Sequence, residues 1–225
     1  IWQGGDVFRA LLIIAGALMA WETSRMHDGP ALVTGALVGV FIFLTFFSFG
    51  LSSIVLLGIQ ILVALIIATL HRKAKATVFL AIAVVIFATT ALGNFRDDYG
   101  LTLTLWLLAC VVASDIGGYF AGKIFGGPKL WVRISPKKIW AVTLGGWVLA
   151  AIVGVLFVPL TFVPFSILVA IAAQSGDLAE SAMKRRAGIK DSSNLIPGHG
   201  GLLDRFDGVL GVCLLVFLAG IVGLM

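Results

Sequence analysis

Long apolar segments follow one another along almost the whole chain, with only short polar connections between them. A helix that crosses the hydrocarbon core of a membrane needs about 20 predominantly apolar residues. Candidate segments lie at 7–21, 30–49, 52–70, 76–93, 101–121, 140–160, 162–183 and 207–225. With 60% hydrophobic and 12% charged residues, the chain cannot hide its apolar surface in one water-soluble core. We therefore predict an all-α, polytopic integral membrane protein with about eight transmembrane helices.

The candidate helices form one predicted domain, residues 1–225, because no internal repeat or low-complexity stretch divides the chain. We divide it into an N-terminal helical bundle portion, 1–100, and a catalytic portion, 101–225. The chain begins with Ile1 instead of methionine. This first residue leaves room for a ninth helix upstream.

The basic residues indicate how the segments are oriented. If the loops at 22–29, 71–75, 122–139 and 184–206 share one side, that side collects all Lys and Arg residues except Arg9 and Arg96. The positive-inside rule then makes it the cytoplasmic side. The resulting basic surface suits anionic headgroups or nucleotide phosphates. Nucleic acid is a poor partner, because no soluble basic domain with interleaved aromatic residues is present.

Several acidic residues lie where a charge is costly. Asp115, Asp177 and Glu180 fall within predicted spans, and a carboxylate at membrane depth needs a polar cavity, a cation or a partner. Asp177, Glu180, Ser181 and Lys184 follow helical spacing, so they form one polar stripe. Asp204 and Asp207 stand one turn apart where the chain re-enters the membrane. We predict that Asp177, Asp204 and Asp207 hold Mg²⁺; a purely structural seam between helices is the alternative.

The segment between these acids is rich in glycine and positive charge. Gly198-His199-Gly200-Gly201 allows backbone N–H groups to approach an anion closely. Lys184, Arg185, Lys190 and Arg205 supply charge for phosphate oxygens. Acids for a metal, basic side chains and a glycine-rich loop together indicate phosphoryl or nucleotidyl chemistry. A lone loop histidine such as His199 is more often structural than catalytic.

The second long hydrophilic loop has a related composition. It follows Asp115-Ile116-Gly117-Gly118 and contains Lys123, Lys129 and Ile134-Ser135-Pro136-Lys137-Lys138. Simple positive-inside anchoring, with Trp140 at the membrane interface, explains the lysines. It does not explain Asp115 or the paired glycines, so we assign this loop to the site as well.

The stretch from Ser181 to Asp207 resembles the signature of the phosphatidate cytidylyltransferases. That pattern runs S-x-x-K-R, four residues, K-D, then P-G-H-G-G, two residues and D-R-x-D, and every fixed position is met. The segment from Asp115 to Lys138 resembles the second conserved block of this family. The N-terminal half matches only as a generic bundle, although Ala20-Trp21-Glu22 stands where relatives often carry a similar triplet. Ile139 and Ala141 depart from the Thr and Glu that are common in relatives, so both are left out of the predicted site.

The resemblance implies that CTP and phosphatidic acid react to CDP-diacylglycerol and pyrophosphate in a cytoplasm-facing polar cavity of a bacterial plasma (inner) membrane. It further implies Mg²⁺, with K⁺ as a candidate second cation, and a homodimer. The predicted catalytic residues are Asp177, Ser181, Lys184, Asp204 and Asp207. The predicted substrate-binding residues are Asp115, Lys123, Ser135, Lys137, Lys138, Arg185, Lys190, Asp191, His199, Gly200 and Arg205.

Two alternatives remain at the level of the sequence. A related CTP-dependent membrane enzyme that acts on an isoprenoid lipid or alcohol would carry similar features. A cation-coupled transporter would use Asp115, Asp177 and Glu180 as a relay. Transporters often show inverted repeats with broken helices, and the sequence shows no such pairing.

Overall fold

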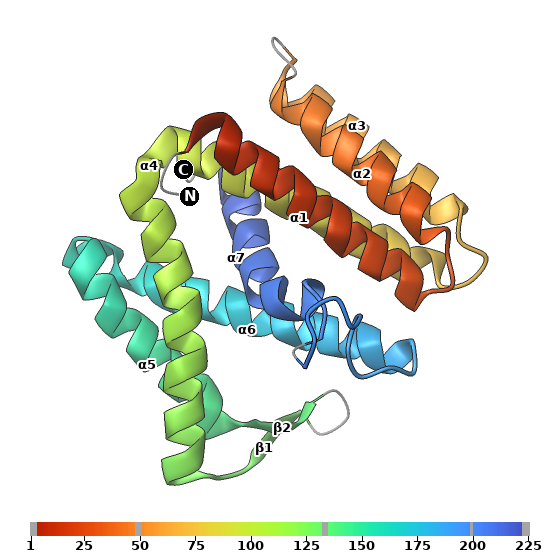
Figure 1. Cartoon of the computed structure of the whole chain (residues 1–225). Coiled ribbons are helices and arrows are strands. Elements are labelled where there is room, and N and C mark those ends of the chain that lie inside the picture. Colours follow the sequence, from red (N-terminus) through yellow and green to blue (C-terminus); the bar gives the residue numbers. More distant parts are fainter. Residues whose placement is uncertain (1–3, 48–50, 132–134, 199, 222–225) are drawn as a thin grey trace.

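The computed structural model describes residues 4–47, 51–131, 135–198 and 200–221. Its first three helices are α1 (Gly5–Met26), α2 (Ala31–Phe46) and α3 (Ser53–Thr69). The predicted segments 7–21, 30–49 and 52–70 correspond to them. Helix α1 runs five residues further than expected at its C-terminal end, and α2 lies along it (Figure 1). This extra length of α1 brings Glu22 into the helix.

Helix α4 (Lys75–Phe125) joins two segments that the sequence predicted as separate spans, 76–93 and 101–121. The polar residues between them remain helical up to Gly100, where the chain bends sharply (Figure 1). Gly100 has φ of 81° and ψ of −177°, a conformation that is accessible almost only to glycine. The sequence-based expectation of a loop around Arg96 was therefore wrong, and a single glycine makes the turn.

The second half of the chain begins with a short hairpin. Strands β1 (Lys129–Trp131) and β2 (Ser135–Ile139) pair antiparallel, with Lys129 opposite Ile139 and Trp131 opposite Ser135. The predicted loop 122–139 thus contains the end of α4 and a small two-stranded sheet. Helix α5 (Trp140–Phe157), the 3₁₀ turn η1 (Leu160–Phe162), α6 (Val163–Arg186) and α7 (Leu203–Ile221) follow.

Small residues let these helices pack closely where the site lies. A Cβ atom at Gly176 of α6 would stand 2.2 Å from the carbonyl oxygen of Asp207 in α7. In the same contact, a Cβ atom at Gly211 would stand 2.2 Å from the carbonyl oxygen of Ala172. Gly117 of α4 and Gly145 of α5 form a similar contact. The paired glycines of the sequence therefore serve helix packing.

The surface of the molecule supports a membrane location. Within the described residues, four helices are long and apolar enough to cross a bilayer: α1, α4, α5 and the segment Leu160–Arg186. Helices α2 and α3 are shorter apolar helices. Many large hydrophobic side chains are exposed, among them Leu32, Ile54 and Leu156, each about four-fifths exposed. The prediction of an α-helical integral membrane protein is confirmed at this level.

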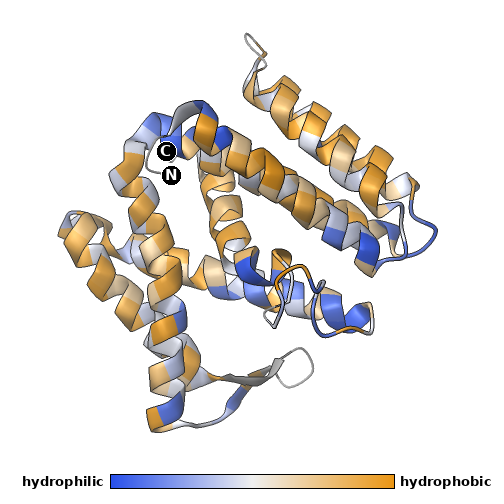
Figure 2. Ribbon diagram, in the orientation of Figure 1, coloured by the Kyte–Doolittle hydropathy of each residue, from blue (hydrophilic) through white to orange (hydrophobic). Residues whose placement is uncertain are grey.

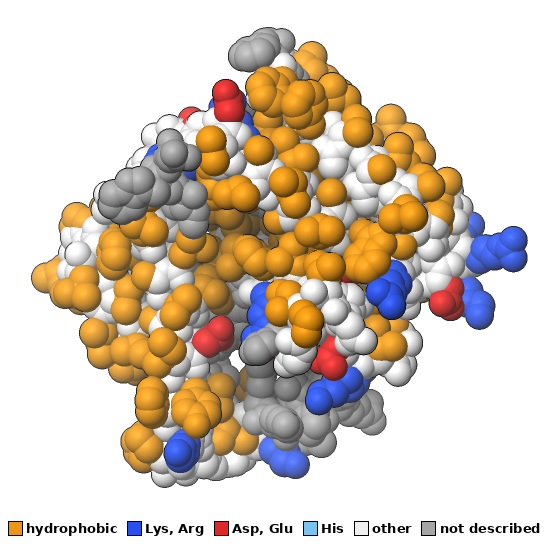
Figure 3. Space-filling view, viewed as in Figure 1, with side chains coloured by type: hydrophobic (Ala, Val, Ile, Leu, Met, Phe, Trp, Pro, Cys, Tyr) orange, Lys and Arg blue, Asp and Glu red, His pale blue; other side chains and the backbone are white. Residues whose placement is uncertain are grey.

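Hydrophilic residues concentrate at the ends of the helices (Figure 2). One group covers the C-terminal ends of α1 and α6 and the connection from α3 to α4, at the right of the view. Another lies near the bend of α4, where Arg9 forms a 2.7 Å ion pair with Asp97. Lysine and arginine side chains gather along the lower and right margins of the face in Figure 3. Three of the loops predicted to share a side, 22–29, 71–75 and 184–206, thus reach the same end of the molecule.

Candidate active site

Three carboxylates converge between α6 and α7. Asp177 and Glu180 lie one turn apart on α6, and Asp207 lies in the second turn of α7; one oxygen of each is within 4.8 Å of the others. Glu180 is buried, and its Oε1 has no hydrogen-bond partner among the described residues. Asp115 on α4 interacts electrostatically with Asp207. This oxygen-rich and partly unsatisfied set fits a hard divalent cation such as Mg²⁺.

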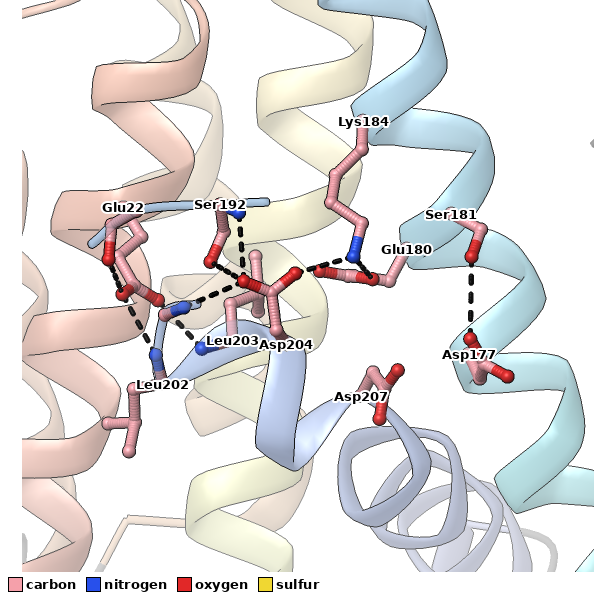
Figure 4. Close-up of polar contacts among 12 residues, drawn as sticks. Glu22, Asp177, Glu180, Ser181, Lys184, Ser192, Leu202, Leu203, Asp204 and Asp207 are labelled. Atoms are coloured by element: carbon pink, nitrogen blue, oxygen red, sulfur yellow. Dashed lines mark hydrogen bonds and ion pairs between the residues drawn. The ribbon is translucent and has the colours of Figure 1, made fainter. Parts of the chain in front are cut away.

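Lys184 forms a bridge from this cluster to Asp204 (Figure 4). Its ammonium nitrogen lies 2.6 Å from Glu180 Oε2 and 2.5 Å from Asp204 Oδ1. The three side chains are only 14%, 5% and 9% exposed, so the charges are desolvated together. One ammonium group therefore neutralises only one charge of these two carboxylates, and the remaining negative charge is shared by them with Asp177 and Asp207.

The second oxygen of Asp204 holds the loop between α6 and α7. Asp204 Oδ2 accepts hydrogen bonds from the Ser192 amide at 2.8 Å, the Ser192 hydroxyl at 2.7 Å and the Gly201 amide at 2.7 Å. Gly200, with φ of 80°, brings the backbone close to this carboxylate, and a Cβ atom there would stand 2.7 Å from it. The glycine-rich segment therefore folds onto a carboxylate of the protein itself.

Glu22 of α1 binds the same loop from the other side (Figure 4). Its Oε1 accepts from the Ser193 hydroxyl at 2.5 Å and the Leu202 amide at 2.9 Å, and its Oε2 accepts from the Leu203 amide at 2.7 Å. The side chain is fully buried. Sequence reasoning placed Glu22 only in a familiar triplet, and no local pattern shows that it meets residues 171 to 181 positions away.

A cavity of about 580 Å³ adjoins the carboxylates and is lined by α4, α6 and α7, with Thr23 of α1. Its wall is mostly apolar, with Leu80, Val84, Leu214 and Leu218 among the lining residues. Glu180, Asp207 and Arg186 contribute polar groups to the same wall. The apolar wall matches apolar chains, and an anionic head would be held by Arg186 and by a cation bound to the carboxylates.

The predicted site residues fall into two groups. Asp177, Lys184, Asp204 and Asp207 lie together, and Ser181 joins them through a 3.3 Å hydrogen bond from its hydroxyl to Asp177 Oδ1. The exposed predicted residues, on α4, the loop and the ends of α6 and α7, are Asp115, Lys123, Arg185, Lys190, Asp191 and Arg205. His199 and the side chains of Ser135, Lys137 and Lys138 lie outside the described residues, whereas the backbone of these last three belongs to β2.

The geometry adds Glu180 to the carboxylates that can face a cation. The predicted metal set was Asp177, Asp204 and Asp207; in the structure Glu180, not Asp204, completes the close cluster with Asp177 and Asp207. The helical stripe through Asp177 and Glu180 was the signal that pointed to it. A role of Asp204 as a metal ligand stays a prediction, because its oxygens contact Lys184, Ser192 and Gly201.

Fold and site together define a helical membrane protein with a partly buried carboxylate cluster, suited to a cation, beside an apolar cavity. The model of the cytidylyltransferase family matches residues 1–222. A phosphatidate cytidylyltransferase of Brucella suis biovar 1 is 34% identical over 232 residues, covering 97% of this chain and 86% of its own length. The chain therefore belongs to the cytidylyltransferase family.

Two further relatives match mainly over part of the chain. The phosphatidate cytidylyltransferase of Bacillus subtilis is 40% identical over 124 residues, which are 52% of this chain and 46% of its own length. That of Mycobacterium leprae is 43% identical over 146 residues, 62% and 47% respectively. The predicted family is thereby confirmed, and the match extends over the N-terminal half, where the sequence indicated only a generic bundle.

Proposed function

We propose that this chain transfers the cytidylyl group of CTP to phosphatidic acid and so forms CDP-diacylglycerol and pyrophosphate. The observation that carries this proposal is the carboxylate cluster beside the apolar cavity, in a chain that belongs to the cytidylyltransferase family. The three relatives described above all bear the name of this activity. A soluble nucleotide substrate alone would not need an apolar cavity among membrane helices.

The cavity supports a lipid as the acceptor. Leu80, Val84, Leu214 and Leu218 offer apolar surface for acyl chains, and burial of each methylene group contributes about 0.8 kcal/mol. The lipid phosphate then lies at the polar end of the cavity. Exposed basic residues at the same end of the molecule, Arg185, Arg186 and Lys190, are available for the phosphates of CTP.

In the proposed reaction, an anionic oxygen of the lipid phosphate forms a bond to the α-phosphorus of CTP. The bond from this phosphorus to the oxygen that bridges to the β-phosphate breaks, and pyrophosphate leaves with that electron pair. The attacking oxygen is already ionised near pH 7, so the step requires no strong general base. The main task of the protein is to bring two anions together, which basic side chains and bound cations accomplish.

Asp177, Glu180 and Asp207 are the residues that would hold Mg²⁺, with Asp115 nearby. When bound, the ion supplies positive charge against the phosphate oxygens and orients them. Lys184 keeps Glu180 and Asp204 in place beside this centre. A second cation such as K⁺, a homodimer and a site facing the cytoplasm of a bacterial inner membrane remain parts of the proposal that the family resemblance supports.

A lipid-product assay tests the proposal. Purified protein in mixed micelles receives labelled CTP, Mg²⁺ and either phosphatidic acid or a polyprenyl phosphate, and the lipid products are separated. We expect labelled CDP-diacylglycerol with phosphatidic acid only, and none with Asp204→Asn. Product with the isoprenoid acceptor alone, or no product from folded wild-type protein, would contradict the proposed substrate.

A further inference from the structure

The carboxylate of Glu22 has no contact with the acidic cluster, yet it binds the middle and the end of the loop that leads to Asp204 and Asp207. Ser193 stands near the middle of this loop, Leu202 at its end, and Leu203 is the first residue of α7. Ser193 also accepts a 3.0 Å hydrogen bond from the Leu195 amide, which tightens the first part of the loop. Glu22 thus joins α1 to the segment that carries the two aspartates.

The electrostatic setting of Glu22 shows where its stabilisation comes from. It lies in the last turns of α1, where the helix dipole disfavours a negative charge. The amides of Leu202 and Leu203 stand at the N-terminus of α7, where free N–H groups and the dipole favour a negative charge. The buried charge of Glu22 is therefore stabilised by the loop and by the N-terminus of α7, and its own helix α1 does not stabilise it.

Glu22 and Asp204 hold the loop as a pair. Asp204 binds Ser192 and Gly201, and Glu22 binds the next residue in each case, Ser193 and Leu202. Position 201 has no space for a side chain, because a Cβ atom there would stand 2.3 Å from Glu22 Oε1 and 2.1 Å from the Ser192 hydroxyl. A shift of either carboxylate moves the first turn of α7.

We infer that Glu22 is a positioning residue of the reaction: through the 192–203 loop it fixes where α7 begins, and hence where Asp204 and Asp207 stand relative to Asp177 and Glu180. This inference rests on the proposed function. Glu22 touches neither the cluster nor the cavity, so its loss lowers kcat more than it changes KM for CTP.

The test compares Glu22→Gln with Ser24→Ala in the full chain. Glutamine has one acceptor oxygen, so its NH₂ group faces the Leu203 amide and that hydrogen bond is lost. Ser24 is equally buried on α1, but its hydroxyl contacts His71 and Thr34, away from the loop. We expect Glu22→Gln to lower kcat by about 10- to 100-fold with KM for CTP within about threefold. Ser24→Ala should keep kcat near that of the wild type even if it lowers the thermal midpoint.

Two further measurements keep the inference testable if Glu22→Gln folds poorly. Hydrogen exchange of the peptide around Leu202 and Leu203 should accelerate in Glu22→Gln and stay unchanged in Ser24→Ala. Ser193→Ala removes one of the three hydrogen bonds of Glu22, together with the bond from the Leu195 amide. Its loss of kcat should be smaller than that of Glu22→Gln, and the two losses should not add fully. Unchanged kcat in Glu22→Gln, equal losses in Ser24→Ala or full additivity would overturn the inference. An inactive wild type would instead refute the proposed function. The exchange data would still show whether Glu22 holds the start of α7 in place.

Discussion

At the scale of single residues, the balance of charge around Lys184 decides what the site can do. Lys184 lies between Glu180 and Asp204, while one oxygen each of Asp177, Glu180 and Asp207 lie within 4.8 Å of one another. Carboxylates this close repel one another unless a cation or a proton joins them. The repulsion within the cluster therefore favours cation binding and lowers the stability of the fold when no cation is bound.

Asp207→Asn separates the effect of the cluster on catalysis from its effect on stability. We expect CDP-diacylglycerol formation to fall by about 100- to 1,000-fold, because a group that stabilises developing charge is lost. The thermal midpoint in detergent should not fall, since one of three mutually repelling carboxylates is removed. Asp98→Asn, an exposed aspartate near the bend of α4, is the matched control and should keep full activity. Equal activity of both variants would speak against the cluster as the catalytic centre.

Lys184→Met keeps the length of the side chain and removes its charge. Glu180 and Asp204 are then buried without their ammonium partner, and the loss of one partner of a buried ion pair costs about 3–5 kcal/mol. We expect a clearly lower midpoint of thermal unfolding. Adding Glu180→Gln should recover part of this loss, because one uncompensated charge disappears. A midpoint of thermal unfolding equal to that of the wild type would show that water solvates Lys184 and its two carboxylate partners in the protein.

At the scale of elements, the contact between α6 and α7 sets the distance between the carboxylates. Gly176 and Gly211 let the two backbones meet, and Asp177 and Asp207 stand beside this contact. The bend at Gly100 has a comparable effect, since it directs the second half of α4 along α5 (Figure 1). Helix packing therefore sets the geometry of the site together with the loop that Glu22 and Asp204 hold.

Gly211→Ala tests this contact against Gly220→Ala in the same helix. The new methyl group at 211 would meet the Ala172 carbonyl, whereas position 220 has no atom within 4 Å. Overpacking of this kind costs about 1–3 kcal/mol. We expect Gly211→Ala to lower both the thermal midpoint and kcat, while Gly220→Ala changes neither appreciably. A loss of stability in both variants alike would indicate a general effect on α7.

At the scale of the whole molecule, the polar ends of the bundle define two sides. The connection from α3 to α4 lies at the same end as the loop between α6 and α7, and the bend of α4 lies at the other (Figure 2). Hydrophobic side chains cover much of the surface between them (Figure 3). The positive-inside rule predicts that the first end faces the cytoplasm.

Cysteine labelling in intact bacterial cells checks this orientation. Cys110 and Cys213 are buried, so an added cysteine dominates the labelling. We expect Asp98→Cys to react with a membrane-impermeant maleimide applied outside, because it is exposed near the bend of α4. Lys73→Cys, exposed at the opposite end, should react only after the membrane is permeabilised. The reverse pattern would invert the proposed topology.

The sequence by itself determined the class of the protein and much of the candidate site, because both depend on local patterns. Hydropathy over 20 residues identifies a membrane helix, and helical spacing alone places Asp177, Glu180, Ser181 and Lys184 on one face. The motif from Ser181 to Asp207 indicated the family, which the comparisons confirm. None of these inferences requires knowledge of which helices meet.

Only the tertiary structure decided which groups share the site across long separations. Asp204 and Asp207 are equivalent in the sequence, but the rotation of α7 against α6 directs Asp207 to the carboxylate cluster and Asp204 to Lys184 and the loop. Glu22 enters for the same reason, since α1 packs beside residues that are 171 to 181 positions away. Such contacts depend on packing between surfaces that local sequence patterns do not specify.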